Sequence, residues 1–425
     1  MLSTIKNAWK IPELRKRILF TIFLVAVYRL GSHIPVPGID STKLAKSLDQ
    51  TGLVGFYDLI SGGAFRRFSI FAMGVIPYIN SSIIMQLLTV AIPYLEQLSK
   101  EGEEGRKKIQ KYTRNVSVVL AALQSYGVYV YIYNYGYVKS DTIFNTFMII
   151  LTLTTASTFL MWLGDMITVK GIGNGVSLLI FVNIIAGLPD TAGTINYLRQ
   201  QNTVTTLNVI LFAIGAAALV FFVIIMSLSE RRITVQYAGK VAGNKTFQGQ
   251  SSHIPFNLTS TGVIAIIFAM SVLSFPTTIA KFFPNHAWSI WVQSSKYSPF
   301  NDQKWVYPVV YAILVIFFSW FYAEVTFKPE EMAENIYKSS GFIPGIRPGK
   351  STYEYIEKVL FRVAMIGGLF AAVIAIIPVI VNAQTKFQQI SFGGTSILIM
   401  VGVAMDTVRQ LESQLIMRHY HGFLK

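Results

Sequence analysis

The side chains that could do chemistry in this 425-residue chain are few, and their positions do not suggest a catalytic site. The histidines fall in predicted loops or tails, and no acidic residue stands at a spacing suited to paired general acid and base catalysis. There is no cysteine, which excludes a disulfide, a thiolate metal site and a cysteine nucleophile. We therefore expect no catalytic residue, no metal, no cofactor and no enzyme. The histidines are His33, His253, His286, His419 and His421.

Ionisable residues are also scarce within the long apolar stretches. Proton and ion relays in transporters and pumps need such residues inside the membrane. The candidates all lie near the ends of predicted spans, where interfacial charges are ordinary. They are Arg29, Asp165, Glu324 and Asp406. No P-loop occurs, and GIGNG at 171–175 does not fit a dinucleotide fingerprint. The sequence therefore indicates a passive conduit that is powered by a partner or by a gradient.

The elements that position these residues are membrane spans. A hydrophobic content of 52%, a mean hydropathy of +0.50 and only 13% charged residues are typical of a polytopic membrane protein. The basic N-terminus precedes an apolar run without a small-residue cleavage site, so we expect a retained first span. The ten predicted spans cover residues 18–34, 68–92, 115–136, 143–164, 172–189, 206–228, 257–279, 306–325, 361–382 and 393–413.

Two pairs of short stretches repeat along the chain. GVSLLI at 175–180 resembles GTSILI at 394–399, and GVI at 74–76 recurs at 262–264. In all four places an isoleucine follows the glycine by five residues, near the middle of an apolar stretch. These isoleucines are Ile79, Ile180, Ile267 and Ile399. They fall in spans two, five, seven and ten, which predicts two inverted five-span halves with a pathway at their interface.

We place the boundary between the halves at residue 190. Residues 1–190 hold spans one to five, and residues 191–425 hold spans six to ten. If the N-terminus is cytoplasmic, that side of the membrane carries most of the 36 Lys and Arg residues, as the positive-inside rule requires. Both termini are then predicted to be cytoplasmic.

Two predicted cytoplasmic loops, 229–256 and 326–360, are longer than simple connectors. In the first loop Ile233 and Val235 alternate with polar residues and turn residues follow, so we expect a hairpin. Its basic residues could dock an acidic partner or lipid, or could serve only to fix the membrane topology. These residues are Arg231, Arg232 and Lys240. In the second loop Pro and Gly bracket Arg347 in a rigid turn, which suits recognition of carboxylate or phosphate.

The apolar segment at 56–65 is too short to cross a bilayer. It is predicted to be either a re-entrant half-helix or an amphipathic helix on the outer surface. Irregular backbone at membrane depth has to be buried in protein or line a cavity, because lipid cannot satisfy its peptide groups. Gly62 and Gly63 would let the segment bend away.

Several motifs, taken in order, resemble the SecY/Sec61 alpha family of protein-conducting channels over essentially the whole chain. The resemblance implies an all-α polytopic membrane protein with ten transmembrane helices in two inverted five-helix halves around a central pore, plus a short plug half-helix. The short ends resemble the form typical of Gram-positive bacteria. The matching motifs are GGAFRRFSIFAMGVIPYINSSIIMQLL (62–88), KEGEEGRKKIQKYTR (100–114), GIGNGVSLLIF (171–181), ERRITVQYAGK (230–240), GFIPGIRPG (341–349) and FGGTSILIMVGVAMD (392–406).

The resemblance also implies roles for individual residues. The pore ring would be Val75, where the family usually has isoleucine, with Ile79, Ile180, Ile267 and Ile399. The plug would be Tyr57, Asp58, Leu59, Ile60, Ser61, Gly62, Gly63 and Ala64. Gln86 and Asn174 match a polar cluster at a lateral gate between spans two/three and seven/eight, although they could also be ordinary interhelical contacts. The family's motor and ribosome contacts would fall on the two long loops, with Arg347 at the arginine on which motor function depends.

The family's function would be to pass unfolded secretory polypeptides across the bacterial cytoplasmic membrane and to release membrane segments sideways into it. The implied partners are small SecE-like and SecG-like membrane subunits, the SecA ATPase, the ribosome, signal peptides, unfolded substrate polypeptides and membrane lipid. YidC-like and SecDF-like proteins are further candidates. A secondary transporter or lipid flippase is the rival class, but it requires a charged or unwound midplane site and a coupling ion.

Overall fold

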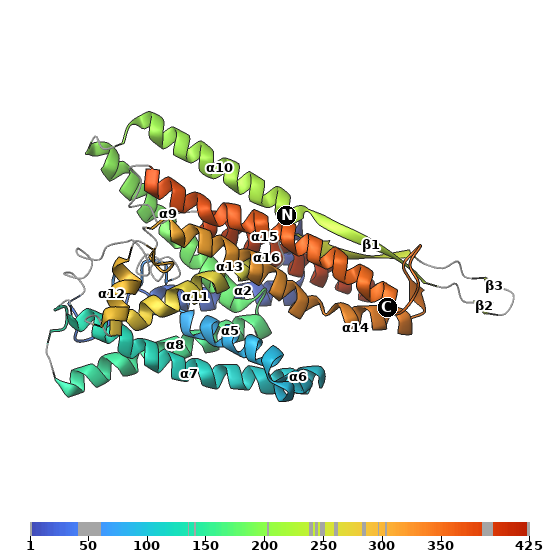
Figure 1. The fold of residues 1–425 in the computed structure, drawn as a ribbon, viewed down its shortest axis with the longest axis horizontal. Helices are drawn as coiled ribbons and strands as arrows, with labels where there is room; N and C mark the ends of the chain where they lie inside the picture. Colours follow the sequence, from blue (N-terminus) through green and yellow to red (C-terminus); the bar gives the residue numbers. More distant parts are fainter. Residues whose placement is uncertain are drawn as a thin grey trace.

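The protein is a bundle of long helices with a small sheet at one end (Figure 1). In Figure 1, α10 lies along the upper edge, α7 and α8 lie along the lower edge, and the strands extend to the right. The computed structural model describes residues 2–40, 61–134, 136–139, 142–201, 204–237, 241–242, 245–246, 251–258, 262–282, 286–295, 297–301, 304–384 and 394–422.

The first half of the chain forms a connected group of helices. α7 packs against α5 and α8, and α8 in turn packs against α2 and α9. The bounds are α1 (Leu2–Lys10), α2 (Pro12–Gly31), α5 (Ile76–Ala91), α6 (Pro93–Lys100), α7 (Glu103–Asn134), α8 (Ile143–Lys170) and α9 (Gly175–Gln200).

The second half is arranged in a similar order. α13 packs against α11 and α15, and α16 packs against α10 and α15. The two groups meet where α11 contacts α5 and α7, and where α16 contacts α9. The bounds are α10 (Thr206–Leu228), α11 (Gly262–Phe282), α12 (Ala287–Ser294), α13 (Val306–Phe327), α14 (Pro329–Lys338), α15 (Lys350–Gln384) and α16 (Gly394–Gly422).

Each of the ten expected spans coincides with a described helix. By length and hydropathy alone, six of the described helices could cross a membrane, and the number rises to seven if the pair α5 and α6 is counted as one. α10 is the most apolar, and only 6% of its most apolar window is buried within this chain. A surface this apolar and this exposed is stable only in hydrocarbon, so the molecule is a polytopic membrane protein.

The second span differs from its expected form. Residues 68–75 form successive turns, and the helix begins only at Ile76, with Pro77 in its first turn. The chain then bends by 99° between α5 and α6, where Pro93 begins the new helix. Proline lacks the N–H that would continue the hydrogen bonding of the preceding helix. The span is therefore a short helix with an irregular segment in front of it.

The sheet joins the two long loops that are predicted to be cytoplasmic. β1 (Glu230–Tyr237) pairs antiparallel with β4 (Ser251–Asn257), which confirms the predicted hairpin. β5 (Gly341–Phe342), from the second loop, pairs with the other edge of β1. The short strands β2 (Val241–Ala242) and β3 (Lys245–Thr246) pair with each other. Ile233 and Val235 of β1 are buried against residues of α13, α14 and α15, so the two loops share one apolar core.

Candidate functional site

The glycines of the internal repeat mark the starts of four helices. Gly175, Gly262 and Gly394 are the first residues of α9, α11 and α16, and Gly74 lies two residues before α5. A side chain at Gly175 would clash with α8, because its Cβ would lie 2.0 Å from the Gly164 carbonyl oxygen. Glycine therefore lets this helix begin in direct contact with the preceding one.

The predicted ring residues occupy equivalent places in these helices. Ile180, Ile267 and Ile399 are each the sixth residue of their helix, and Ile79 is the fourth residue of α5. They lie nearer to the helix starts than the sequence suggested. The reason is that α9 and α16 continue beyond their apolar stretches, whereas the residues before α5 are not helical.

The ring side chains belong to one continuous apolar cluster. The exposed fraction is 3% for Val75 and Ile180, 9% for Ile79 and 2% for Ile399, whereas Ile267 is half-buried against the same cluster. Side chains this enclosed do not line an open aqueous lumen. A constriction made of aliphatic side chains can exclude water and ions, which is the role predicted for these residues.

The predicted plug lies partly outside the described residues. Tyr57, Asp58, Leu59 and Ile60 fall outside them, whereas Ser61, Gly62, Gly63 and Ala64 are described. Ser61 and Ala64 are fully buried, and the Ser61 hydroxyl accepts a hydrogen bond of 3.0 Å from the Phe65 N–H. We call residues 61–75 the return segment. It begins with the described end of the plug, residues 61–64, and leads to Val75 of the predicted ring.

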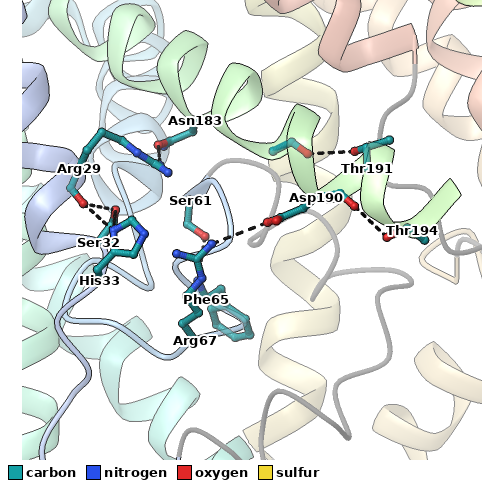
Figure 2. A network of polar contacts seen from close by, with 11 residues as sticks. Arg29, Ser32, His33, Ser61, Phe65, Arg67, Asn183, Asp190, Thr191 and Thr194 are labelled. Atoms are coloured by element: carbon teal, nitrogen blue, oxygen red, sulfur yellow. Dashed lines mark hydrogen bonds and ion pairs between the residues drawn. The ribbon is translucent and has the colours of Figure 1, made fainter. Parts of the chain in front are cut away.

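The return segment is held between α2 and α9 (Figure 2). Arg67 on this segment lies 3.7 Å from the Asp190 carboxylate on α9. Two turns earlier on α9, the side-chain oxygen of Asn183 accepts a hydrogen bond of 3.5 Å from Arg29 of α2. Phe68 is fully buried in the left-handed region, with φ of +45°, and its carbonyl accepts from the Val36 N–H at 2.9 Å. The tertiary contacts therefore hold a backbone conformation that an aromatic residue rarely adopts.

The two predicted gate residues do not contact each other by a hydrogen bond in this structure. Asn174 is the N-cap of α9, and its side chain accepts from the Ser177 N–H at 3.1 Å. Gln86 is half-buried on α5. The position of Asn174 is explained by helix capping, because an asparagine oxygen satisfies an otherwise unpaired N–H of the first turn.

Buried polar atoms on the helices of predicted spans two, three and eight were not expected from the sequence. Within the described residues, Asn80 on α5, Gln124 on α7 and Tyr311 on α13 each bury a side-chain oxygen without a hydrogen-bond partner. An unpaired buried polar group destabilises the packed state. A polar residue inside an apolar stretch, such as Asn80 next to Ile79, was the available signal.

The predicted docking residues are mostly exposed. Arg231 and Arg232 are exposed on β1, and Arg232 pairs with Glu230, whereas Lys240 lies outside the described residues. Arg347 is exposed between Gly345 and Gly349, both of which have a positive φ. Its carbonyl accepts a hydrogen bond of 3.0 Å from the Thr352 hydroxyl.

Charges from both halves of the chain influence one another near α6 and α14. Lys100 donates to Glu96 at 2.8 Å, and this hydrogen bond lowers the pKa of Glu96 and raises the pKa of Lys100. Glu330 and Glu331 at the start of α14 raise the pKa of Lys100 further. Within the described ranges, no three His, Asp or Glu side chains gather as a metal site would require.

Solved structures share this architecture. The structure described as that of a protein conducting channel has a TM-score of 0.66 at 17% identity and covers 97% of each chain. Sec61 in the canine ribosome-channel complex from the endoplasmic reticulum has a TM-score of 0.62 at 16% identity, with the same coverage. The fold is that of a polytopic helical membrane protein of the channel class.

Sequence comparisons identify the family. The SecY family model matches residues 69–408. The protein translocase subunit SecY of Halalkalibacterium halodurans is 41% identical over the full length of both chains. The protein of the same name from Thermotoga maritima is 41% identical over the whole of this chain and 98% of its own. This chain belongs to the SecY family of protein translocase subunits, and such a subunit is a channel component and not an enzyme.

Proposed function

We propose that this chain is the pore-forming subunit through which unfolded secretory polypeptides cross the bacterial cytoplasmic membrane. The observation that carries the proposal is the enclosed aliphatic ring at the starts of α5, α9, α11 and α16. Such a ring blocks ions while empty, yet it can yield to an extended chain because aliphatic rotamers change at low cost. It needs no recognition of sequence in the substrate.

The pore is proposed to lie between two inverted halves, 1–190 and 191–425. Packing supports this division, because the contacts among α5, α7, α8 and α9 recur in order among α11, α13, α15 and α16. Val75, Ile79, Ile180, Ile267 and Ile399 then form the constriction. The plug, Tyr57–Ala64, rests beside it and moves away when a substrate enters.

Membrane segments are proposed to leave sideways between α5/α7 and α11/α13. The contacts of α11 with α5 and α7 support a gate that is closed here. Its unpaired buried oxygens on Asn80, Gln124 and Tyr311 favour opening, because water or a passing peptide could satisfy them. An apolar signal segment gains about 0.3 to 0.6 kcal/mol per Leu, Ile, Phe or Val at the centre of the bilayer. Gln86 and Asn174 remain proposed gate residues.

The cytoplasmic sheet and the Arg347 turn are proposed to receive the source of energy. The exposure of Arg231, Arg232 and Arg347 supports docking of an acidic surface on the SecA ATPase or on the ribosome, with Lys240 as a further contact. SecE-like and SecG-like subunits complete the proposed channel, and YidC-like or SecDF-like proteins are accessory. This side of the membrane, with both chain termini, is proposed to be cytoplasmic.

The test is reconstitution. The purified chain, with small single-span subunits, would be placed in proteoliposomes with the ATPase, ATP and a secretory precursor that carries a signal peptide. We expect the precursor to become protected from added protease only when both ATP and the signal peptide are present. Protection that appears equally without the ATPase, or transport of a small solute driven by an ion gradient, would refute the proposal.

A further inference from the structure

Asn183 of α9 lies where this helix meets α2 and the return segment (Figure 2). It is 1% exposed and lies one helical turn beyond Ile180 on α9. Its amide nitrogen donates to the buried Tyr28 hydroxyl at 2.5 Å, and its oxygen accepts from Arg29 at 3.5 Å. Because an arginine can only donate, the oxygen must face Arg29, and this fixes the orientation of the amide.

The end of the plug rests directly on this asparagine. A Cβ at Gly62 would lie 2.9 Å from the Cα, the Cβ and the Oδ1 of Asn183. Gly62 also has φ of +63°, a conformation in which a side chain is strained. The absence of a side chain at residue 62 therefore lets the return segment press against the backbone and the side chain of Asn183.

Tyr28, one of the partners of Asn183, also contacts the return segment. The ring of Tyr28 lies 5.5 Å from the ring of Phe71, which also packs on Gly31 of α2. The ion pair of Arg67 and Asp190 is more than 40% exposed at both side chains, so it contributes little to the stability of the return segment. The close approach of Gly62 to Asn183 is thus a buried contact between the end of the plug and α9.

We propose that Asn183 is a positioning residue that forms the seat of the plug. Held by Tyr28 and Arg29, its side chain presents a fixed surface that fits only a glycine at residue 62. The inference rests on the proposed function, and it adds that the strength of this seat sets how readily the plug leaves the ring. Weakening the seat raises the population of displaced plug in the absence of substrate.

The test uses a thiol introduced beside the seat. The chain has no cysteine, so Ser61→Cys introduces its only thiol. Ser61 is fully buried in this structure. In the assembled channel we would measure the rate at which a membrane-impermeant maleimide modifies this thiol. Adding Asn183→Ala should raise the rate roughly tenfold, the size expected when buried polar groups lose their partners. The resting ion leak should rise with it.

Two matched variants on the same background make the result specific. Asn183→Asp should keep a rate near the parent, because a carboxylate still accepts from Arg29 and can accept from the Tyr28 hydroxyl. Thr191→Ala should have no effect, because the Thr191 hydroxyl bonds only the Gly187 carbonyl of its own helix. Equal rates in the alanine and aspartate variants at residue 183 would overturn the proposal.

If Asn183→Ala prevents assembly of the channel, Tyr28→Phe replaces it in the test. Tyr28→Phe removes one partner of Asn183 but keeps the aromatic contact with Phe71, and it should raise thiol modification about threefold, by the loss of one hydrogen bond. An unchanged rate in Tyr28→Phe would also overturn the seat. Thiol modification does not depend on protein transport, so a channel that fails to translocate contradicts the proposed function separately.

Discussion

Gly341 and Tyr237 face each other where the two long loops join. They are paired residues of the β5 and β1 ladder, and a Cβ at Gly341 would lie 3.0 Å from the Cε1 atom of the Tyr237 ring. The same Cβ would lie 3.2 Å from the Cγ2 atom and the carbonyl oxygen of Ile336 on α14. Glycine therefore lets β5 of the second loop pair closely with β1 of the hairpin, and the two loops share an apolar core with α13 and α15.

Gly341→Val should separate the loops without affecting the spans. Overpacking a tight contact costs about 1–3 kcal/mol, so we expect a lower midpoint of thermal unfolding in detergent and a weaker stimulation of the motor ATPase. Ser339→Ala, at an exposed position close by, is the control. Normal ATPase stimulation in the valine variant would show that the junction has no role in docking.

Ile399→Asn should open the seal of the pore. A polar side chain at a fully enclosed ring position favours hydration of the constriction, so ion flux across vesicles should rise severalfold, and precursors with defective signals should pass. Ile399→Val keeps the position apolar and should remain tight. We would measure conductance in planar bilayers, and equal conductance for the two variants would remove Ile399 from the ring.

Deletion of residues 57–64 should leave a folded and insertable protein. None of the ten predicted spans includes these residues, so the expected cost is ion leak and relaxed selectivity for signals. Membrane assembly and leak would be measured in parallel, with Gly62→Leu as a point variant that displaces the plug end through its clash at Asn183. Loss of assembly on deletion, with a tight Gly62→Leu channel, would identify the segment as a structural brace.

Arg347→Glu should abolish motor-driven transport without destabilising the chain. Arg347 is exposed, and exposed charges contribute about 0–1 kcal/mol, so the thermal midpoint should stay within about 2 °C. Arg347→Lys should be impaired to a lesser degree, because lysine keeps the charge but loses the bidentate fork. Motor binding and transport that survive the charge reversal would show that this turn is only a connector.

Tyr311→Phe should stabilise the closed gate. The Tyr311 hydroxyl is buried without a partner, so its removal relieves an unpaired polar group and should raise the thermal midpoint on the order of 1–3 °C. The neighbouring Tyr307, whose ring lies 5.7 Å from that of Tyr311, provides the control, and Tyr307→Phe should not raise the midpoint. A lower midpoint for Tyr311→Phe would mean that the hydroxyl has a stabilising role.

Much of the fold could be predicted from the sequence because a bilayer imposes one strong rule on apolar length. The alternation of Ile233 and Val235 likewise predicted the hairpin, since a half-buried strand has a period of two. The turns at 68–75 could not be predicted, because hydropathy does not distinguish buried irregular backbone from helix. The pairing of Gly341 with Tyr237 depends on a contact about one hundred residues apart in sequence, which no local pattern reports.

The candidate site, too, could be predicted from the sequence only in part. The internal repeat located four isoleucines that lie near helix starts, because a glycine and an aliphatic side chain five residues later are local features of sequence. Their place in a pore ring stays a prediction. Asn174 was expected at a gate and is a helix cap, and its role at the gate stays a prediction. Asn183 was not expected at all, because its importance comes from Tyr28 and Gly62, which are distant in the chain.

The short α5 has a consequence for biosynthesis. Its 16 residues extend about 24 Å, less than a hydrocarbon core of about 30 Å, and the turns before it leave peptide groups that lipid cannot satisfy. The segment around residues 61–92 therefore depends on neighbouring parts of the protein to shelter its irregular part. Its contacts with Asn183 and Asp190 of α9 can form only when that helix has been synthesised, so the segment reaches its final place only after spans three and four have been made.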